Sequence, residues 1–210
     1  MAKELEGFVA RLTALGGGSG KSRDVYDDWA PTYEQNLKED YGYIAPRLAV
    51  DVFVRYCPPS DRRVLDLACG TGLVGLELAD RGYTEFDGLD VSPGMLHVAR
   101  EKGIYRELIV GDMMQPINLG ERVYDGAIAV GCFGGGHLGP EHLAHVIACV
   151  RPGGLVVLYM NAIPYDEDDY PAHFNKLEEQ GQCRVLTSER SNYMQSIDRP
   201  GWAVALRRGT

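Results

Sequence analysis

The sequence has no pair of cysteines spaced for a disulfide framework or a zinc site. Its five cysteines are an odd number, lie far apart and include no C-x-x-C motif, so neither a disulfide scaffold nor a metal site is expected. No apolar run approaches the length of a membrane span, and residues 1–8 lack the apolar core of a signal peptide. These absences predict a cytoplasmic protein that does not act at a membrane.

Positive charge is also scarce. The 21 Lys and Arg residues against 30 Asp and Glu give a net charge of −9. Nucleic-acid binding requires a basic face, so no nucleic-acid partner is expected, although a local basic patch could lie within an acidic average. The composition carries no information on the oligomeric state. The charge favours a neutral or cationic small-molecule partner.

The glycine-rich run at 16–20 lacks the spacing of a phosphate-binding P-loop. The first glycine of that motif would fall at Leu15, and no apolar strand precedes it. We interpret the run as a linker that follows a short amphipathic helix at 2–15. Residues 1–22 are therefore expected to be a flexible N-terminal segment.

The most informative segment is 64–72, which reads V-L-D-L-A-C-G-T-G. A short apolar run carrying Asp66 ends in a turn where Gly70 and Gly72 alternate with small residues, and a helical pattern follows. Glycines at this spacing let the backbone pass close to a bound ligand. The ligand is expected in a crevice at the carboxyl edge of an α/β sheet.

Strands and helices alternate after this turn. Strand patterns at 63–67, 85–90, 107–110, 124–130 and 155–160 predict a parallel sheet with helices on both faces. Two further strand patterns, at 184–188 and 202–206, have no helix between them. They predict one antiparallel strand near the C-terminus. The expected fold class is α/β, a Rossmann-like, seven-stranded and mostly parallel sheet over residues 61–210.

An aromatic segment precedes this domain. Tyr26, Trp29 and Tyr33 recur on one helical face, although Pro31 interrupts the pattern. One interpretation is that residues 23–60 form a helical cap, or lid, whose hydroxyls reach a ligand in the crevice. The alternative is that the rings only pack against the body of the protein.

Two classes of ligand fit the glycine turn. Residues 70–75 match G-x-G-x-x-G and Asp90 follows twenty residues later, as in NAD sites, but any adenosine ligand in this crevice could use the same residues. The negative charge of Asp66 disfavours a pyrophosphate and favours the ammonium and sulfonium of S-adenosylmethionine. An acid at Asp112, after the third strand, can accept from an adenine amino group. The C-terminal hairpin also favours S-adenosylmethionine.

Five ordered motifs resemble the class I S-adenosylmethionine-dependent methyltransferases. They are the 64–72 segment, G-L-D-V-S-P-G-M-L, G-D-M, Y-D-G-A-I-A-V and R-P-G-G-L-V-V-L, and together they cover about residues 64–160. Upstream, Y-D-D-W-A-P-T-Y-E-Q and A-P-R-L-A-V-D are similar to the methyltransferase-like proteins named for the Williams–Beuren syndrome region. The resemblance implies methyl transfer from S-adenosylmethionine by in-line displacement to a small-molecule or side-chain N or O acceptor. S-adenosylhomocysteine would be the product.

The resemblance also implies roles for individual residues. The methionine portion would lie against Asp66, Ala68, Gly70, Gly72 and Val130. The ribose and adenine would lie against Asp90, Val91, Met95, Asp112 and Met113. The cap residues Tyr26, Trp29 and Tyr33 would cover the cofactor. An NAD-linked oxidoreductase and a non-enzymatic cofactor-binding scaffold remain the alternatives.

A general base is needed only if the acceptor arrives protonated. The loop at 131–139 reads G-C-F-G-G-G-H-L-G and follows the fourth strand, where an acceptor would bind. His137 is the candidate catalytic base in this loop. The alternative is a surface histidine in a glycine-rich turn.

Overall fold

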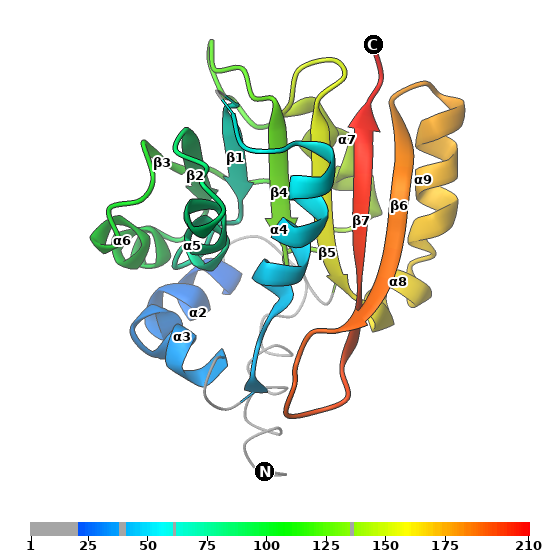
Figure 1. Cartoon of the computed structure of the whole chain (residues 1–210). Coiled ribbons are helices and arrows are strands. Elements are labelled where there is room, and N and C mark those ends of the chain that lie inside the picture. Colours follow the sequence, from blue (N-terminus) through cyan, green and yellow to red (C-terminus); the bar gives the residue numbers. More distant parts are fainter. Residues whose placement is uncertain (1–20, 38–40, 61, 135–136) are drawn as a thin grey trace.

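The strand patterns of the sequence form one sheet in the computed structural model, which describes residues 21–37, 41–60, 62–134 and 137–210 (Figure 1). The helix and linker expected at 2–20 lie outside the described residues. The strands are β1 (Val64–Leu67), β2 (Phe86–Asp90), β3 (Leu108–Val110), β4 (Gly126–Val130), β5 (Leu155–Asn161), β6 (Cys183–Asn192) and β7 (Pro200–Arg208).

The strand order is β3-β2-β1-β4-β5-β7-β6. Neighbours among β1 to β5 pair in parallel, and β7 runs antiparallel to both β5 and β6. The expected Rossmann-like sheet with one antiparallel strand near the C-terminus is therefore confirmed. Both C-terminal strands extend beyond their predicted bounds. Their end residues pair with each other in the sheet although many of them are polar.

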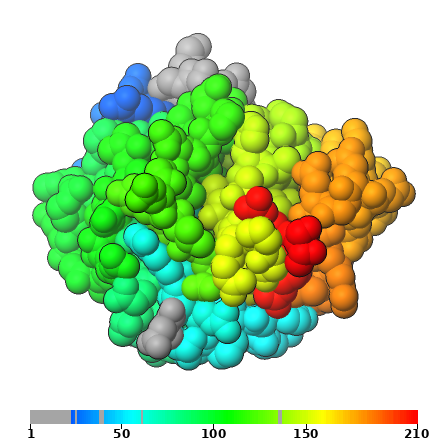
Figure 2. Space-filling view, turned by 90° about the horizontal axis from the view of Figure 1, so that it is seen from above, coloured from blue at the N-terminus to red at the C-terminus, as the bar shows by residue number. Residues whose placement is uncertain are grey.

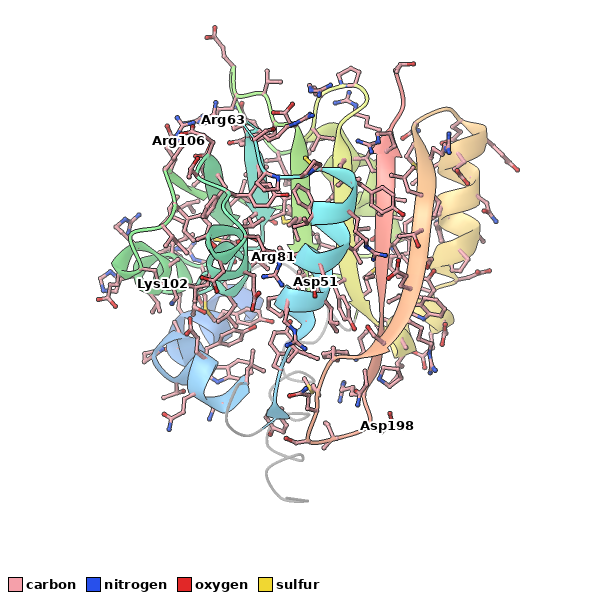
Figure 3. The ribbon with its side chains drawn as sticks, in the orientation of Figure 1. Asp51, Arg63, Arg81, Lys102, Arg106 and Asp198 are labelled. Atoms are coloured by element: carbon pink, nitrogen blue, oxygen red, sulfur yellow. The ribbon has the colours of Figure 1, made fainter. Side chains whose placement is uncertain are left out.

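Two apolar cores lie on opposite faces of the sheet. Helices α4 (Ala45–Tyr56) and α5 (Leu73–Asp80) cover one face, and α7 (Leu143–Ala148), α8 (Ala162–Glu167) and α9 (Tyr170–Glu179) cover the other. The central strand β1 is buried along its whole length, which explains why all of its residues except Asp66 are apolar. Arg81 and Asp51 join the two helices of the first face through a 2.5 Å ion pair (Figure 3).

The helix α6 (Pro93–Glu101) begins where its sequence predicts. Ser92 is its N-cap, and the Ser92 hydroxyl accepts a 3.0 Å hydrogen bond from the backbone N–H of Met95. Pro93 occupies the first turn, where its missing N–H costs nothing. This start places the last residues of β2 at the edge of the sheet.

The expected cap at 23–60 separates into two parts. Helix α2 (Lys21–Trp29), the 3-10 turn η1 (Ala30–Thr32) and α3 (Tyr33–Gln35) lie at the carboxyl edge of the parallel strands, at the bottom of Figure 1. Pro31 is the second residue of η1, where the regular α-helix has ended. Helix α4 instead packs against the sheet, because its apolar side fits against Ile128 and Val157.

The opposite edge of the sheet faces the viewer in Figure 2, where the red C-terminal residues are exposed. There the turn at 151–154 pairs with the end of β7, since Gly153 N–H donates to the Arg208 carbonyl at 3.1 Å and Arg208 N–H to that of Gly154 at 2.9 Å. These bonds fix the 151–154 turn to the end of β7 at the amino edge of the sheet. A ligand is expected at the other edge, where the parallel strands have their carboxyl ends.

Candidate cofactor site

A cavity opens between the carboxyl edge of the sheet and the helices α2 and α3. Its empty volume is about 900 Å³ with the open mouth included. The wall combines residues from the ends of four parallel strands with residues of the cap. The lining residues are Arg23, Tyr26, Tyr33, Ala68, Gly70, Asp90, Val91, Met95, Gly111, Asp112, Met113, Met114, Val130, Gly131, Cys132, His137 and Leu138.

Asp90 is the most constrained polar group of this wall. Its side chain is only 8% exposed. Gly70 N–H donates to one carboxylate oxygen at 2.8 Å, and Ser92 N–H donates to the other at 2.9 Å. Burial raises the Asp90 pKa, and these backbone donors oppose the rise. The result is a fixed pair of acceptor oxygens suited to hydroxyl donors.

The wall next to Asp90 is apolar. Val91 and Met95 line it from the start of α6, and Met113 lines it from the loop after β3. Asp112 lies at the end of this surface, and one of its carboxylate oxygens accepts from Met114 N–H at 2.9 Å. A flat aromatic ring would contact thioether and aliphatic groups here, with one acid within reach of its edge.

Hydrogen bonds that the Asp27 carboxylate accepts join the cap to α6 and its N-cap. One carboxylate oxygen of Asp27 accepts from Gly94 N–H at 2.8 Å and from the Ser92 hydroxyl. A Cβ on Gly94 would lie 2.9 Å from that oxygen, so only glycine allows this approach. A second tie joins Lys102, labelled in Figure 3, to Glu34 at 2.6 Å.

The three aromatic residues of the cap form one cluster. The Trp29 ring packs against Tyr26 and Tyr33, with ring centroids 6.3 and 4.9 Å away. Trp29 is buried beneath them, and its indole N–H donates to Asn36. Burial raises the pKa of both tyrosines, so both hydroxyls stay protonated and neutral.

The cavity ends at the loop after β4. Val130 and Cys132 line it there, and the Tyr26 hydroxyl lies 3.3 Å from Nε2 of His137. Burial lowers the His137 pKa, which keeps the imidazole neutral near pH 7. Burial also raises the pKa of the Cys132 thiol to about 12, so Cys132 is not an activated nucleophile.

Comparison with known proteins agrees with this geometry. Residues 64–154 match the family described as "Methyltransferase domain". The chain is 40% identical over 136 residues to the human methyltransferase-like protein 27, which covers 63% of this chain and 55% of that protein. Residues 64–154 therefore match a methyltransferase domain, in agreement with the class I S-adenosylmethionine-dependent methyltransferases that the sequence motifs resemble. This similarity argues against the NAD-linked alternative.

Two further likenesses extend the comparison. The chain is 45% identical over 69 residues to the 18S rRNA (guanine-N(7))-methyltransferase RID2 of Arabidopsis thaliana, covering 33% of this chain and 24% of that protein. An S-adenosylmethionine-dependent methyltransferase from Clostridium acetobutylicum shares the fold, with a TM-score of 0.62, 15% identity and coverage of 88% and 99% of the two chains. The chain spans about half the length of protein 27 and a quarter of RID2.

Most residues predicted for this methyltransferase site line the cavity together, including His137 and ten of the cofactor candidates: Tyr26, Tyr33, Ala68, Gly70, Asp90, Val91, Met95, Asp112, Met113 and Val130. Three others do not line it. Trp29 supports the two tyrosines, Gly72 caps α5, and Asp66 is fully buried beneath the turn. Asp66 lies within β1, which is buried along its whole length, and its carboxyl accepts a hydrogen bond from the Tyr105 hydroxyl.

Sequence reasoning missed three residues of the methyltransferase site. Arg23 lines the cavity one helical turn before Tyr26, and this i, i+3 spacing could have indicated it. Met114 also lines the cavity, next to the predicted Met113. Asp27 joins the cap to α6, and no sequence pattern indicates that contact.

None of the helices that the structure describes is long and apolar enough to cross a membrane. Across residues 21–37, 41–60, 62–134 and 137–210, no group of three or more His, Cys, Asp or Glu side chains is arranged to hold a metal ion.

Proposed function

We propose that this protein uses S-adenosylmethionine to methylate a nitrogen or oxygen of a small molecule or of an amino-acid side chain. The observation that carries the proposal is Asp90, whose two oxygens are fixed by Gly70 and Ser92 inside the cavity. This arrangement offers two acceptors at the end of β2, where the ribose diol of an adenosyl ligand is expected.

The other lining residues fit the same ligand. Val91, Met95 and Met113 would contact the adenine, and Asp112 would accept from its amino group. The backbone of the 68–70 turn would adjoin the methionine portion, with Tyr26 and Tyr33 above it. When bound, the cofactor supplies a methyl group that its sulfonium already activates. The protein therefore has mainly to align an acceptor and receive its proton.

The acceptor would bind beside Val130 and the 131–138 loop. A neutral His137 can receive the proton of an N–H or O–H acceptor at Nε2, either directly or through the Tyr26 hydroxyl that lies 3.3 Å away. The cavity wall carries the acids Asp90 and Asp112, and among the described residues Arg23 is its one permanently cationic side chain. This balance supports a neutral or cationic acceptor over a polynucleotide, although one relative is named as an rRNA methyltransferase.

Calorimetric titration with S-adenosylmethionine, S-adenosylhomocysteine and NAD tests the cofactor. Asp90→Ala removes both acceptor oxygens and is expected to weaken binding of the two adenosyl ligands by about 1–3 kcal/mol, roughly 5- to 150-fold. Asp80→Ala, at an exposed acid of α5, is the control and should bind as the wild type does. Tight NAD binding, or equal affinities for Asp90→Ala and wild type, would contradict the assignment.

Transfer of a radiolabelled methyl group tests the activity. Label recovered in the small-molecule or protein fraction of an extract supports the proposed acceptor class. Label recovered only in RNA would replace that class with a nucleic acid. Cofactor binding without label in any fraction would favour a non-enzymatic scaffold.

A further inference from the structure

The cavity end beside the loop after β4, here called the β4 end, is lined by uncharged side chains. The cap contributes two tyrosines, and the strand end and loop contribute aliphatic, thiol and imidazole groups: Tyr26, Tyr33, Val130, Cys132, His137 and Leu138. Burial keeps the titratable members neutral near pH 7, because it raises the pKa of the tyrosines and the thiol and lowers that of the imidazole.

The charged side chains of the cavity wall are engaged elsewhere. Asp90 interacts electrostatically with the β4 end, but both of its oxygens already accept backbone N–H bonds. Arg23 faces Asp27, with 3.8 Å between its Nε and one carboxylate oxygen, and the other oxygen of Asp27 is bonded to the start of α6. Asp112 follows β3, and two strands of the sheet separate β3 from β4. Among the described residues, none of these groups is placed to pair with an ion at the β4 end.

The backbone of the glycine-rich loop is bonded within the protein. Gly134 N–H donates to the Leu138 carbonyl at 2.8 Å, Leu138 N–H to that of Cys132 at 3.0 Å, and His137 N–H to that of Gly134 at 3.2 Å. A run of free backbone N–H groups can hold an anion, but these three groups are already used. An ionic group that entered the β4 end would lose water without gaining a partner, which is costly.

Aromatic rings bound the β4 end. The ring centroids of Tyr26 and Tyr33 are 6.3 Å apart, edge to face, and the His137 ring lies 5.9 Å from that of Tyr26. The Tyr26 hydroxyl lies 3.3 Å from Nε2 of His137, so the cap and the loop meet at the cavity. Such a wall suits a small planar ring, which gains from edge-to-face or offset contacts with aromatic side chains.

We propose that the methyl acceptor is a small aromatic molecule that binds at the β4 end as an uncharged species, with a phenolic hydroxyl or a ring N–H as its reacting group. This inference rests on the proposed function and narrows its acceptor class. Nε2 of His137 and the Tyr26 hydroxyl are the polar atoms that can meet this group. Ammonium, carboxylate and phosphate acceptors find no partner at this end among the described residues.

Calorimetric titration of the S-adenosylhomocysteine complex tests the inference by binding alone. The probes share one carbon skeleton: 2-naphthol, decahydro-2-naphthol, 2-naphthoate and 2-naphthylmethylamine. At pH 7 we expect the saturated alcohol to bind about three- to tenfold more weakly than 2-naphthol, and the two ionic probes at least about tenfold more weakly. The affinity of the amine should rise about tenfold per pH unit up to its own pKa, because only its neutral form binds.

A charge introduced at the β4 end should reverse this preference. Cys132→Asp places a carboxylate in the wall and should raise the affinity for the protonated amine at least about tenfold at pH 7. Cys132→Asn has the same shape without the charge and should show no such gain. A gain in affinity cannot arise from a loss of folding, and thermal unfolding of both variants checks that they are folded.

The outcomes separate this inference from the proposed function. The acceptor class is wrong if a charged or saturated probe binds as tightly as 2-naphthol, if none of the probes binds, or if folded Cys132→Asp gains no affinity for the amine. Radiolabelled methyl recovered in protein instead of small molecules would also overturn it, while leaving the methyltransferase activity established. If the wild type does not bind S-adenosylhomocysteine, the proposed function itself fails.

Discussion

Asp27 offers a direct way to undock the cap from the body of the protein. One of its oxygens accepts from Gly94 N–H at 2.8 Å and from the Ser92 hydroxyl. The cap residues Tyr26 and Tyr33 line the cavity opposite Asp90. Asp27→Ala would remove both bonds and leave the ion pair between Glu34 and Lys102 as a remaining side-chain tie. The expected consequence is a cap that spends less time closed over the cofactor.

The magnitude follows from the two bonds. The Asp27 side chain is 33% exposed, so each bond is expected to contribute about 0.5–1.5 kcal/mol net. Together they would stabilise the docked cap by about 1–3 kcal/mol. If the cofactor binds only beneath a docked cap, the apparent dissociation constant would rise by up to roughly 5- to 150-fold. The sheet and its two cores do not include these bonds and should stay folded.

Calorimetric titration of S-adenosylhomocysteine measures the loss of affinity. Asp27→Asn is the matched control, because its amide oxygen can still accept from Gly94 and Ser92, and its affinity should lie near that of the wild type. Limited proteolysis should cut Asp27→Ala faster within 21–37, and circular dichroism should show an unchanged sheet. Equal affinities for Asp27→Ala and wild type would refute the idea that cap docking contributes to binding.

Two other substitutions test the turn and the base. Gly75→Ala places a methyl group on the Tyr105 hydroxyl, and this overpacking should lower the free energy of unfolding by about 1–3 kcal/mol in urea denaturation; an unchanged midpoint would mean that Tyr105 moves freely. His137→Gln should slow methyl transfer by about 10²- to 10⁴-fold without changing the affinity for S-adenosylhomocysteine. In the wild type the rate of methyl transfer should decrease at pH values below the lowered pKa of His137, because the imidazole becomes protonated there. The variant should not show this decrease at acidic pH. If the variant keeps it, another group receives the proton.

The sheet and most of the cavity could be predicted because their residues follow local patterns. Strands β1 to β5 are short apolar runs between turn residues, and Ser92 followed by Pro93 marks the start of α6. Parallel strands bring their carboxyl ends to one edge. For this reason Asp90 and Asp112, which follow different strands, were expected at one site and lie in one cavity.

The missed features depend on contacts between segments that are distant in the sequence. Asp27 meets Gly94 across 67 residues, and Tyr105 meets Asp66 across 39. Neither contact leaves a period or a motif in the chain. Asp66 illustrates the same limit: its motif predicts a residue of the cavity wall, but its place in the middle of the central strand β1 buries it completely.

The Tyr105 contact also explains why the glycine pattern alone could not choose between two cofactors. In G-x-G-x-x-G, Gly70 lies in the cavity wall and gives its N–H to Asp90, whereas Gly75 faces away from the cavity and receives Tyr105. In this pattern Gly70 is therefore required by the ligand site, and Gly75 is required by the packing of Tyr105. A dinucleotide site with close packing of its helix against the sheet would require the same letters. The choice between the two cofactors therefore rests on evidence outside the glycine pattern, namely the match of residues 64–154 to a methyltransferase domain.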